Sequence, residues 1–82
     1  MEKKVGEVTH YWGNISVAGL KLTASLSQGD TIRIKGATTD FEQTVGSMQI
    51  EHENIETAKK GQEIGLKVKE KVRRGDTVYK VE

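Results

Sequence analysis

The sequence predicts an all-β fold, in the form of a small closed six-stranded β-barrel. Short runs of alternating apolar and polar residues predict the strands, and glycine-containing turns separate these runs. Closure is predicted because a chain of 82 residues makes a sheet too small to protect open edges. The same length predicts one domain over residues 1–82. Folding buries only about 60–65% of the surface of so short a chain, so we expect a small, continuous core.

The first half of the chain carries three predicted strands, Lys4–Tyr11, Asn14–Leu22 and Thr31–Lys35. A turn or bulge over Trp12–Asn14 separates the first two, because Gly13 and Asn14 both tolerate positive φ. The third alternates strictly, which places Ile32 and Ile34 on one buried face.

The second half predicts three more strands, Asp40–Glu51, Glu63–Lys69 and Thr77–Val81. The apolar residues of the first do not keep one parity, so we expect a bulge or twist near Gly46. Between the first and second, Asn54–Lys60 is compatible with one helical turn that faces Ile55 and Ala58 inward. Gly65 interrupts an apolar strand, which indicates a bend or a close backbone approach.

Composition excludes some classes of protein. Hydrophobic residues make up 34% of the chain and charged residues 30%, with a formal net charge of +1, so no global field favours nucleic acid or acidic lipid. There is no cysteine, hence no disulfide framework and no thiolate metal site. The longest stretch without a charge, Val8–Leu20, is too short and too polar to span a bilayer, and the N-terminus has no signal-peptide pattern. A cytoplasmic location is therefore expected.

The residues predict no metal site, no cofactor and no enzymatic activity. His10 and His52 are the two histidines, and a metal would need further ligands converging on them. Glu51 and Glu53 flank His52, but on a strand they point to the face opposite to it. Serine and threonine are frequent, yet no nucleophile-elbow motif accompanies them. We therefore expect no catalytic residue.

Basic residues form the most suggestive surface pattern. Lys67, Lys69, Lys71 and Arg73 recur at every second position and would share one face of an extended chain, and Arg74 adds a charge at the turn that follows. A solvated strand face is the simpler interpretation, and a stripe that tracks the phosphates of single-stranded RNA is the alternative.

Aromatic residues offer a second candidate surface. Trp12, with Tyr11, lies at a turn, where packing at the barrel rim is favoured over a platform for base stacking. The candidate nucleic-acid-binding residues are thus Lys67, Lys69, Lys71, Arg73, Arg74 and Trp12.

Three turn sequences carry a family resemblance: LSQGDTI over residues 26–32, AKKGQEIGL over 58–66 and VRRGDTV over 72–78. In this order they resemble the second domain of translational GTPases such as elongation factor Tu, which is a six-stranded β-barrel. The segments TTDFEQ over 38–43, SMQ over 47–49 and GDTVYKV over 75–81 look more like the C-terminal barrel of U32-type peptidase-family proteins and small stand-alone relatives.

The resemblance implies two functions. The first is a non-enzymatic, translation-related binding module that contacts RNA or a ribosome-associated protein. The alternative is a protein-docking accessory barrel that acts with a U32 peptidase-like enzyme supplied by another chain. Ser47, Met48 and Gln49 stand where elongation factors carry a Glu-Met-aromatic run beside the aminoacyl-adenosine pocket. The chain has no GxxxxGK[ST] phosphate loop, so no nucleotide-binding site of its own is expected.

Overall fold

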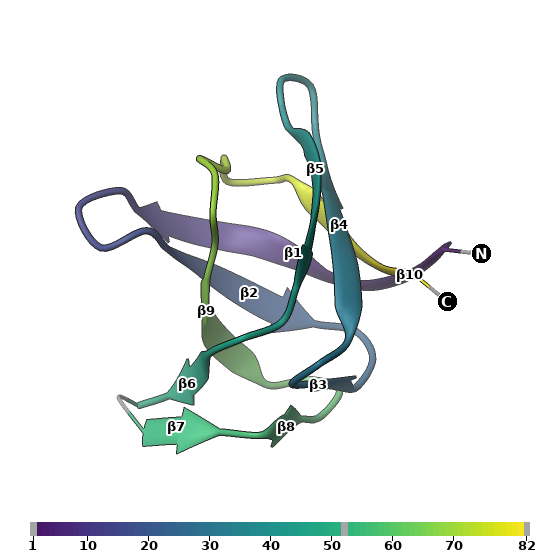
Figure 1. Cartoon of the computed structure of the whole chain (residues 1–82), viewed down its shortest axis with the longest axis vertical. Coiled ribbons are helices and arrows are strands. Elements are labelled where there is room, and N and C mark those ends of the chain that lie inside the picture. Colours follow the sequence, from purple (N-terminus) through teal and green to yellow (C-terminus); the bar gives the residue numbers. More distant parts are fainter. Residues whose placement is uncertain (1, 52, 82) are drawn as a thin grey trace.

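The computed structural model describes residues 2–51 and 53–81, and these residues form strands and turns without a helix, hence without any helix able to cross a membrane. The all-β class predicted from the sequence is confirmed (Figure 1). The strands are β1 (Glu2–Trp12), β2 (Val17–Leu22), β3 (Leu26–Ser27), β4 (Thr31–Lys35), β5 (Asp40–Thr44), β6 (Met48–Ile50), β7 (Glu53–Ile55), β8 (Thr57–Ala58), β9 (Glu63–Lys67) and β10 (Thr77–Val81).

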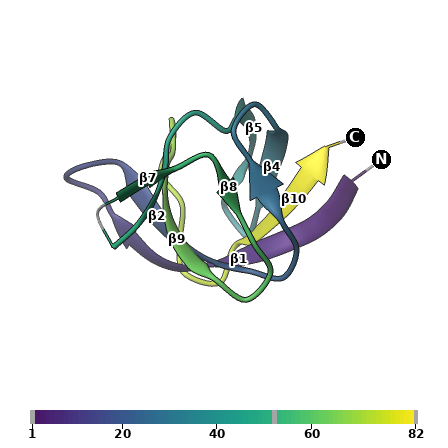
Figure 2. The ribbon, with the colours of Figure 1, turned by 90° about the horizontal axis from the view of Figure 1, so that it is seen from below.

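Eight of these strands form one antiparallel sheet in the order β5-β4-β10-β1-β2-β9-β6-β7, and β3 pairs separately with β8. The sheet curls around the core, as the view from below shows (Figure 2). Its hydrogen-bonded order ends at β5 and β7, so the predicted closed six-stranded barrel is not confirmed. The alternation of apolar and polar residues predicts six long strands. The structure instead contains additional short strands, and segments without strand pairing separate them.

A side chain spans the gap at the β5 edge. Gln43 Nε2 donates to the carbonyl of Lys67 at 2.9 Å, and Gln43 Oε1 accepts from the backbone N–H of Lys69 at 2.9 Å. The amide therefore satisfies one backbone acceptor and one backbone donor that a neighbouring strand would otherwise pair. Gln43 thus joins β5 to the chain that leaves β9 without a backbone ladder between them.

The core lies inside the curled sheet and is aliphatic. Alternation of side-chain direction along each strand brings the inward positions of β2, β4 and β9 together, as the sequence pattern predicts. The largest completely enclosed side chains, each below 2% exposed, are Leu20, Leu22, Leu26, Ile32, Ile34, Met48, Leu66, Val5, Val8, Val45, Val72 and Val78. The protein is small, with a Cα radius of gyration of 11.0 Å, so its core is thin. Each of these side chains therefore fills a large part of the core volume.

Three turns are built alike, and two of them contain a Gly-Asp pair, Gly29-Asp30 and Gly75-Asp76. In each, a glycine with φ of +89° to +95° occupies the third position, as in a type II turn, and the following residue donates its N–H back to the first carbonyl. The side chain of that following residue also accepts the N–H of the first residue: Asp30 from Ser27, Gln62 from Lys59 and Asp76 from Arg73. A new strand starts one residue later in all three.

The middle of the chain differs from the sequence prediction. The expected long strand Asp40–Glu51 is two strands, β5 and β6, because the chain leaves the sheet over residues 45–47, next to the predicted irregularity at Gly46. The expected helical turn over Asn54–Lys60 is wrong, since this segment contributes to β7 and β8. Helix propensity is a weak prior, and pairing with β6 and β3 overrides it.

Arg33 ties β4 to β5 by ion pairs to Asp40 and Glu42 on the outer surface. Arg33 Nε donates to Asp40 Oδ1 at 2.8 Å and its Nη2 donates to Oδ2 at 3.2 Å, while Glu2 lies 3.4 Å from Nη1. The hydrogen bonds from Arg33 lower the pKa of Asp40 below its ordinary value. Arg33 is thus engaged within the sheet and does not belong to a free basic surface.

Candidate functional site

A pair of glycines hollows the outer face of the sheet. Gly19 in β2 lies directly opposite Gly65 in β9, and the same cross-strand row continues to His10 in β1 and Gln49 in β6. The two central members of this row carry no side chain, so the backbone itself forms a floor between the flanking side chains. We call this depression, floored by Gly19 and Gly65, the outer hollow.

Trp12 forms one wall of the outer hollow. A Cβ built on Gly19 would lie 3.2 Å from Trp12 Cζ3, so the edge of the indole rests against the backbone of Gly19. The His10 ring packs against the indole with centroids 4.4 Å apart at 57°. The Trp12 side chain nevertheless stays 43% exposed, because nothing in the described chain covers its outer face. The absence of a Cβ at Gly19 therefore lets the indole lie close to the sheet.

Polar residues form the opposite wall. One part of the outer hollow, with a volume of about 440 Å³, is lined by Trp12, Gln49, Glu51 and Glu63 among others. An overlapping part of about 380 Å³ is lined by Trp12, Ile15, Val17, Gln49, Glu51 and Gly65. These volumes lie in the lower half of the range usual for small-ligand sites. The hollow therefore combines an aromatic wall, a backbone floor and carboxylates.

The β1–β2 turn supplies an apolar rim. Residues 13–16 form this turn, and Ile15 at its tip is 55% exposed. The predicted turn is present, and its residue with positive φ is Ser16, with φ of 55°, although Gly13 and Asn14 would tolerate that conformation. The left-handed conformation at a residue with a Cβ costs roughly 1–2 kcal/mol, which other contacts of the turn must offset. Ser16 contributes one such contact, because its carbonyl accepts the N–H of Val68 at 2.9 Å.

The predicted basic stripe is exposed but does not lie on one strand. β9 ends at Lys67, two residues earlier than predicted, because the backbone then pairs with Ser16 and with the side chain of Gln43. The rest of the stripe, Lys69, Lys71, Arg73 and Arg74, occupies the irregular segment that leads to β10. Within residues 2–51 and 53–81 none of these five cations forms an ion pair.

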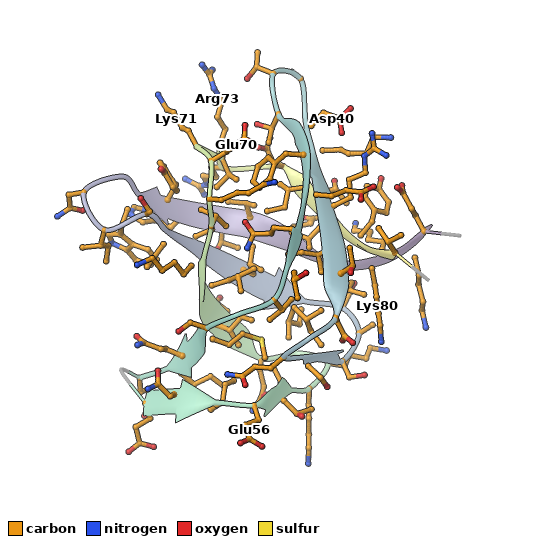
Figure 3. All side chains as sticks on the ribbon, in the orientation of Figure 1. Asp40, Glu56, Glu70, Lys71, Arg73 and Lys80 are labelled. Atoms are coloured by element: carbon orange, nitrogen blue, oxygen red, sulfur yellow. The ribbon has the colours of Figure 1, made fainter. Side chains whose placement is uncertain are left out.

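The structure divides the candidate residues into groups. Lys71 and Arg73 project beyond the ribbon on the same side of the molecule, with Glu70 near them (Figure 3). Lys67 and Lys69 line a depression of about 410 Å³ beside Gln43, and Lys67 also borders the outer hollow beside Val17 and Gly65. The Lys69 ammonium lies 6.0 Å from the centroid of the Phe41 ring.

Trp12 belongs to a different surface from most of the stripe. Among the stripe residues, Lys67 shares the outer sheet face with Trp12, through the row Trp12–Val17–Lys67. The predicted aromatic pair is split, because Tyr11 packs against the core cluster while Trp12 faces outward.

The histidines give no metal centre in the described part of the chain. His10 is exposed and packs at an angle against Trp12, and His52 lies outside the described residues. No group of three histidine, aspartate or glutamate side chains comes together among residues 2–51 and 53–81.

Two solved structures have the same fold as this chain. The chain superposes on the C-terminal domain of a U32 peptidase-type protein from Geobacillus thermoleovorans with a TM-score of 0.89 and 20% sequence identity, covering 95% of this chain and 91% of that one. A selenomethionine variant of that domain matches with a TM-score of 0.88 and 19% identity, covering 93% of this chain and 96% of that chain. The chain therefore has the fold of this C-terminal domain, and the expected likeness to the U32 barrel is confirmed for the fold.

Sequence relatives named as proteases match nearly the whole of this chain. The chain is 46% identical over 77 residues to an uncharacterized protease of Methanocaldococcus jannaschii, a match over 93% of this chain and 19% of that protein. It is 38% identical over 78 residues to a collagenase of Porphyromonas gingivalis, over 93% of this chain and 22% of that protein. The chain thus spans about a fifth of the length of these relatives. No family model matches the chain, and the resemblance to translational GTPases stays a prediction.

Proposed function

We propose that this chain is a non-catalytic docking module that acts with a U32 peptidase-like catalytic region. The observation that carries the proposal is the pair of matches: 46% identity to about a fifth of a protein named as a protease, and a TM-score of 0.89 to a domain that is the C-terminal part of a U32 peptidase-type protein. A segment that forms a minor part of proteins named as proteases is suited to holding or orienting the larger part.

The surface chemistry supports docking over catalysis. Trp12 and Ile15 are the exposed large hydrophobic residues of the described chain, and they lie together at the rim of the outer hollow. Exposed aromatic side chains that are held rigidly are favoured anchors of protein interfaces. Catalysis would instead need a nucleophile or base held by an orienting partner, and the described histidine, His10, is exposed beside Trp12.

The docking proposal predicts a direct complex. The chain, mixed with the separately produced catalytic region of a U32 peptidase-type protein from the same organism, should bind with a dissociation constant of about 10 μM or tighter in calorimetry. Replacing Trp12 and Ile15 together with serine should weaken binding at least about tenfold, because a hot-spot side chain contributes more than 1.4 kcal/mol.

A matched control substitutes two exposed residues away from the outer hollow, Glu56 and Glu70, with serine; these lie at opposite ends of the molecule (Figure 3). This variant should bind like the parent chain. An absence of complex formation at about 100 μM of both components would contradict the docking function.

RNA contact is a second candidate, favoured by the five exposed cations Lys67, Lys69, Lys71, Arg73 and Arg74, which form no ion pair in the described chain. Four phosphate contacts would give a log–log salt slope of about −3 in a titration with single-stranded RNA. Reversal of Lys67, Lys69 and Lys71 to glutamate should abolish binding, whereas the same reversal at the exposed Lys3, Lys21 and Lys60 should not. Equal losses in both variants would indicate net charge alone and contradict a specific stripe.

A further inference from the structure

The outer hollow places an indole and two carboxylates around one space. Trp12, Glu51 and Glu63 all line the part of about 440 Å³, and the two glutamates come from different segments of the chain. Neither carboxylate forms an ion pair with a described residue, although Lys21 is the cross-strand neighbour of Glu63. Two unpaired negative charges next to an exposed aromatic face define a site for a cation.

The shape of the outer hollow favours a long, flat cation. Its floor is bare backbone at Gly65, and the apolar side chains of Ile15 and Val17 lie at the rim. A guanidinium stacks on an indole and forms paired hydrogen bonds with carboxylates, while its methylene stem covers apolar surface. The ammonium of lysine is compact and strongly hydrated, so it matches this combination less well.

The aromatic wall of the hollow is held in place before any ligand arrives. The indole of Trp12 rests on Gly19 and against His10. Ser16 and Glu51, the non-glycine residues with positive φ in the described chain, both belong to segments that border the hollow. A stacking surface that is already in place loses little conformational entropy on binding, which favours recognition of a single side chain.

We propose that the outer hollow binds an arginine side chain of a protein partner, with the guanidinium stacked on Trp12 and hydrogen-bonded to Glu51 and Glu63. The inference rests on the proposed docking function, because it names the side chain by which the partner is held. A phosphate would meet two carboxylates in this space, so charge disfavours RNA here, in contrast to the stripe that begins at Lys67.

Trp12 is the one tryptophan of the sequence, so its fluorescence reports directly on the hollow. The probe is the blocked tripeptide acetyl-Gly-Arg-Gly-amide, and its partner is the same peptide with citrulline, which keeps the shape and removes the charge. We expect a saturable change in Trp12 emission with a dissociation constant on the order of 1 mM for the arginine peptide. The citrulline peptide should bind at least about tenfold more weakly. Equal responses to both peptides, or no saturable response to arginine, would overturn the proposal.

Substitution locates the binding groups. Glu51→Gln together with Glu63→Gln keeps the size of both side chains and should weaken the arginine peptide about tenfold, with the emission spectrum of the free protein unchanged. The matched control, Glu56→Gln with Glu70→Gln, removes the same charge elsewhere and should leave affinity unchanged. Equal weakening in both variants would overturn the proposal, because it would show a net-charge effect. A larger response to uridine monophosphate than to the arginine peptide would also overturn it, in favour of a base-stacking surface.

The same variants separate this inference from the docking function. If the Glu51→Gln/Glu63→Gln variant binds the catalytic region as tightly as the parent, docking stands and the arginine site is overturned as its anchor. If the parent chain binds the arginine peptide but not the catalytic region, docking to that region fails while the arginine site is supported for another protein partner. Loss of both interactions in this variant, with both retained in the control, supports the two together.

Discussion

Gly36→Ala is expected to destabilise the protein by about 3 kcal/mol, a large share of the total stability of a chain of this length. The β-carbon of the new alanine would overlap the carboxylate of Asp76, because that side chain packs directly on the backbone of Gly36. No flexible side chain can give way here, since Asp76 is 5% exposed and is fixed by its own hydrogen bonds.

The carboxylate of Asp76 cannot move without breaking the turn that precedes β10. Its Oδ2 accepts the backbone N–H of Arg73 at 2.9 Å, and its own N–H donates to the carbonyl of Arg73 at 3.1 Å. The carbonyl of Asp76 in turn accepts the N–H of Val8 at 2.8 Å. Displacing the side chain would therefore break the hydrogen bond from the N–H of Arg73 to a charged acceptor, which costs about 1.5–3 kcal/mol in addition to the steric strain.

A double-mutant cycle isolates the contact. Asp76→Ala alone removes the acceptor for Arg73, yet in Gly36→Ala/Asp76→Ala the overlap is gone, so the double variant should lose less stability than the two single losses added. Gly46→Ala is the matched control, because a β-carbon there meets no atom within 4 Å. Urea unfolding followed by Trp12 fluorescence measures all four variants. Equal stability of Gly36→Ala and Gly46→Ala would show that the close approach to Asp76 is wrong.

The sequence predicts the fold well where local rules decide it. Period-two alternation at Ile32 and Ile34 specifies an inward face, and this face is buried as predicted. The turns before β4, β9 and β10 follow from glycines at positions that require positive φ, which are Gly29, Gly61 and Gly75. These features depend on neighbouring residues, so a single sequence contains the information.

Prediction fails where distant segments decide the structure. Asn54–Lys60 contains acceptable helix formers, but β6 and β3 lie beside it and pair with its backbone. Closure of the sheet depends on whether β5 meets the chain after β9, and there the amide of Gln43 replaces a strand ladder. No local pattern indicates that replacement.

The candidate site shows the same division. The sequence identifies Trp12 as a surface aromatic and indicates a close backbone approach at Gly65, but it does not show that Gly65 faces Gly19. That pairing joins residues far apart in the chain, and it is what hollows the sheet face. Glu51 and Glu63 line the same depression only because β2 and β9 pair in this register. The spacing of the basic residues alone predicts the stripe, but it does not predict that the strand ends at Lys67.

Leu20→Ala is expected to cost about 2–5 kcal/mol, because it removes three heavy atoms from the centre of a thin core. Leu20 is completely buried in β2, and its cross-strand neighbours are Val8 in β1 and Ile64 in β9, both also buried. These neighbours are held in the sheet by backbone pairing, so they cannot move inward to fill the space, and the loss should fall in the upper half of that range.

The neighbouring residue provides the control. Lys21 follows Leu20 on the same strand but points outward and is exposed, so Lys21→Ala should change the free energy of unfolding by no more than about 0.5 kcal/mol. Urea unfolding with Trp12 emission measures both variants, and an unchanged slope in Leu20→Ala would show that the change lies in stability and not in the compactness of the denatured state. A loss below about 1 kcal/mol for Leu20→Ala would mean that β2 does not face the core in this register. Since one register sets both faces, Gly19 and Gly65 would then no longer form the floor of the outer hollow, and the arginine site would lose its structural basis.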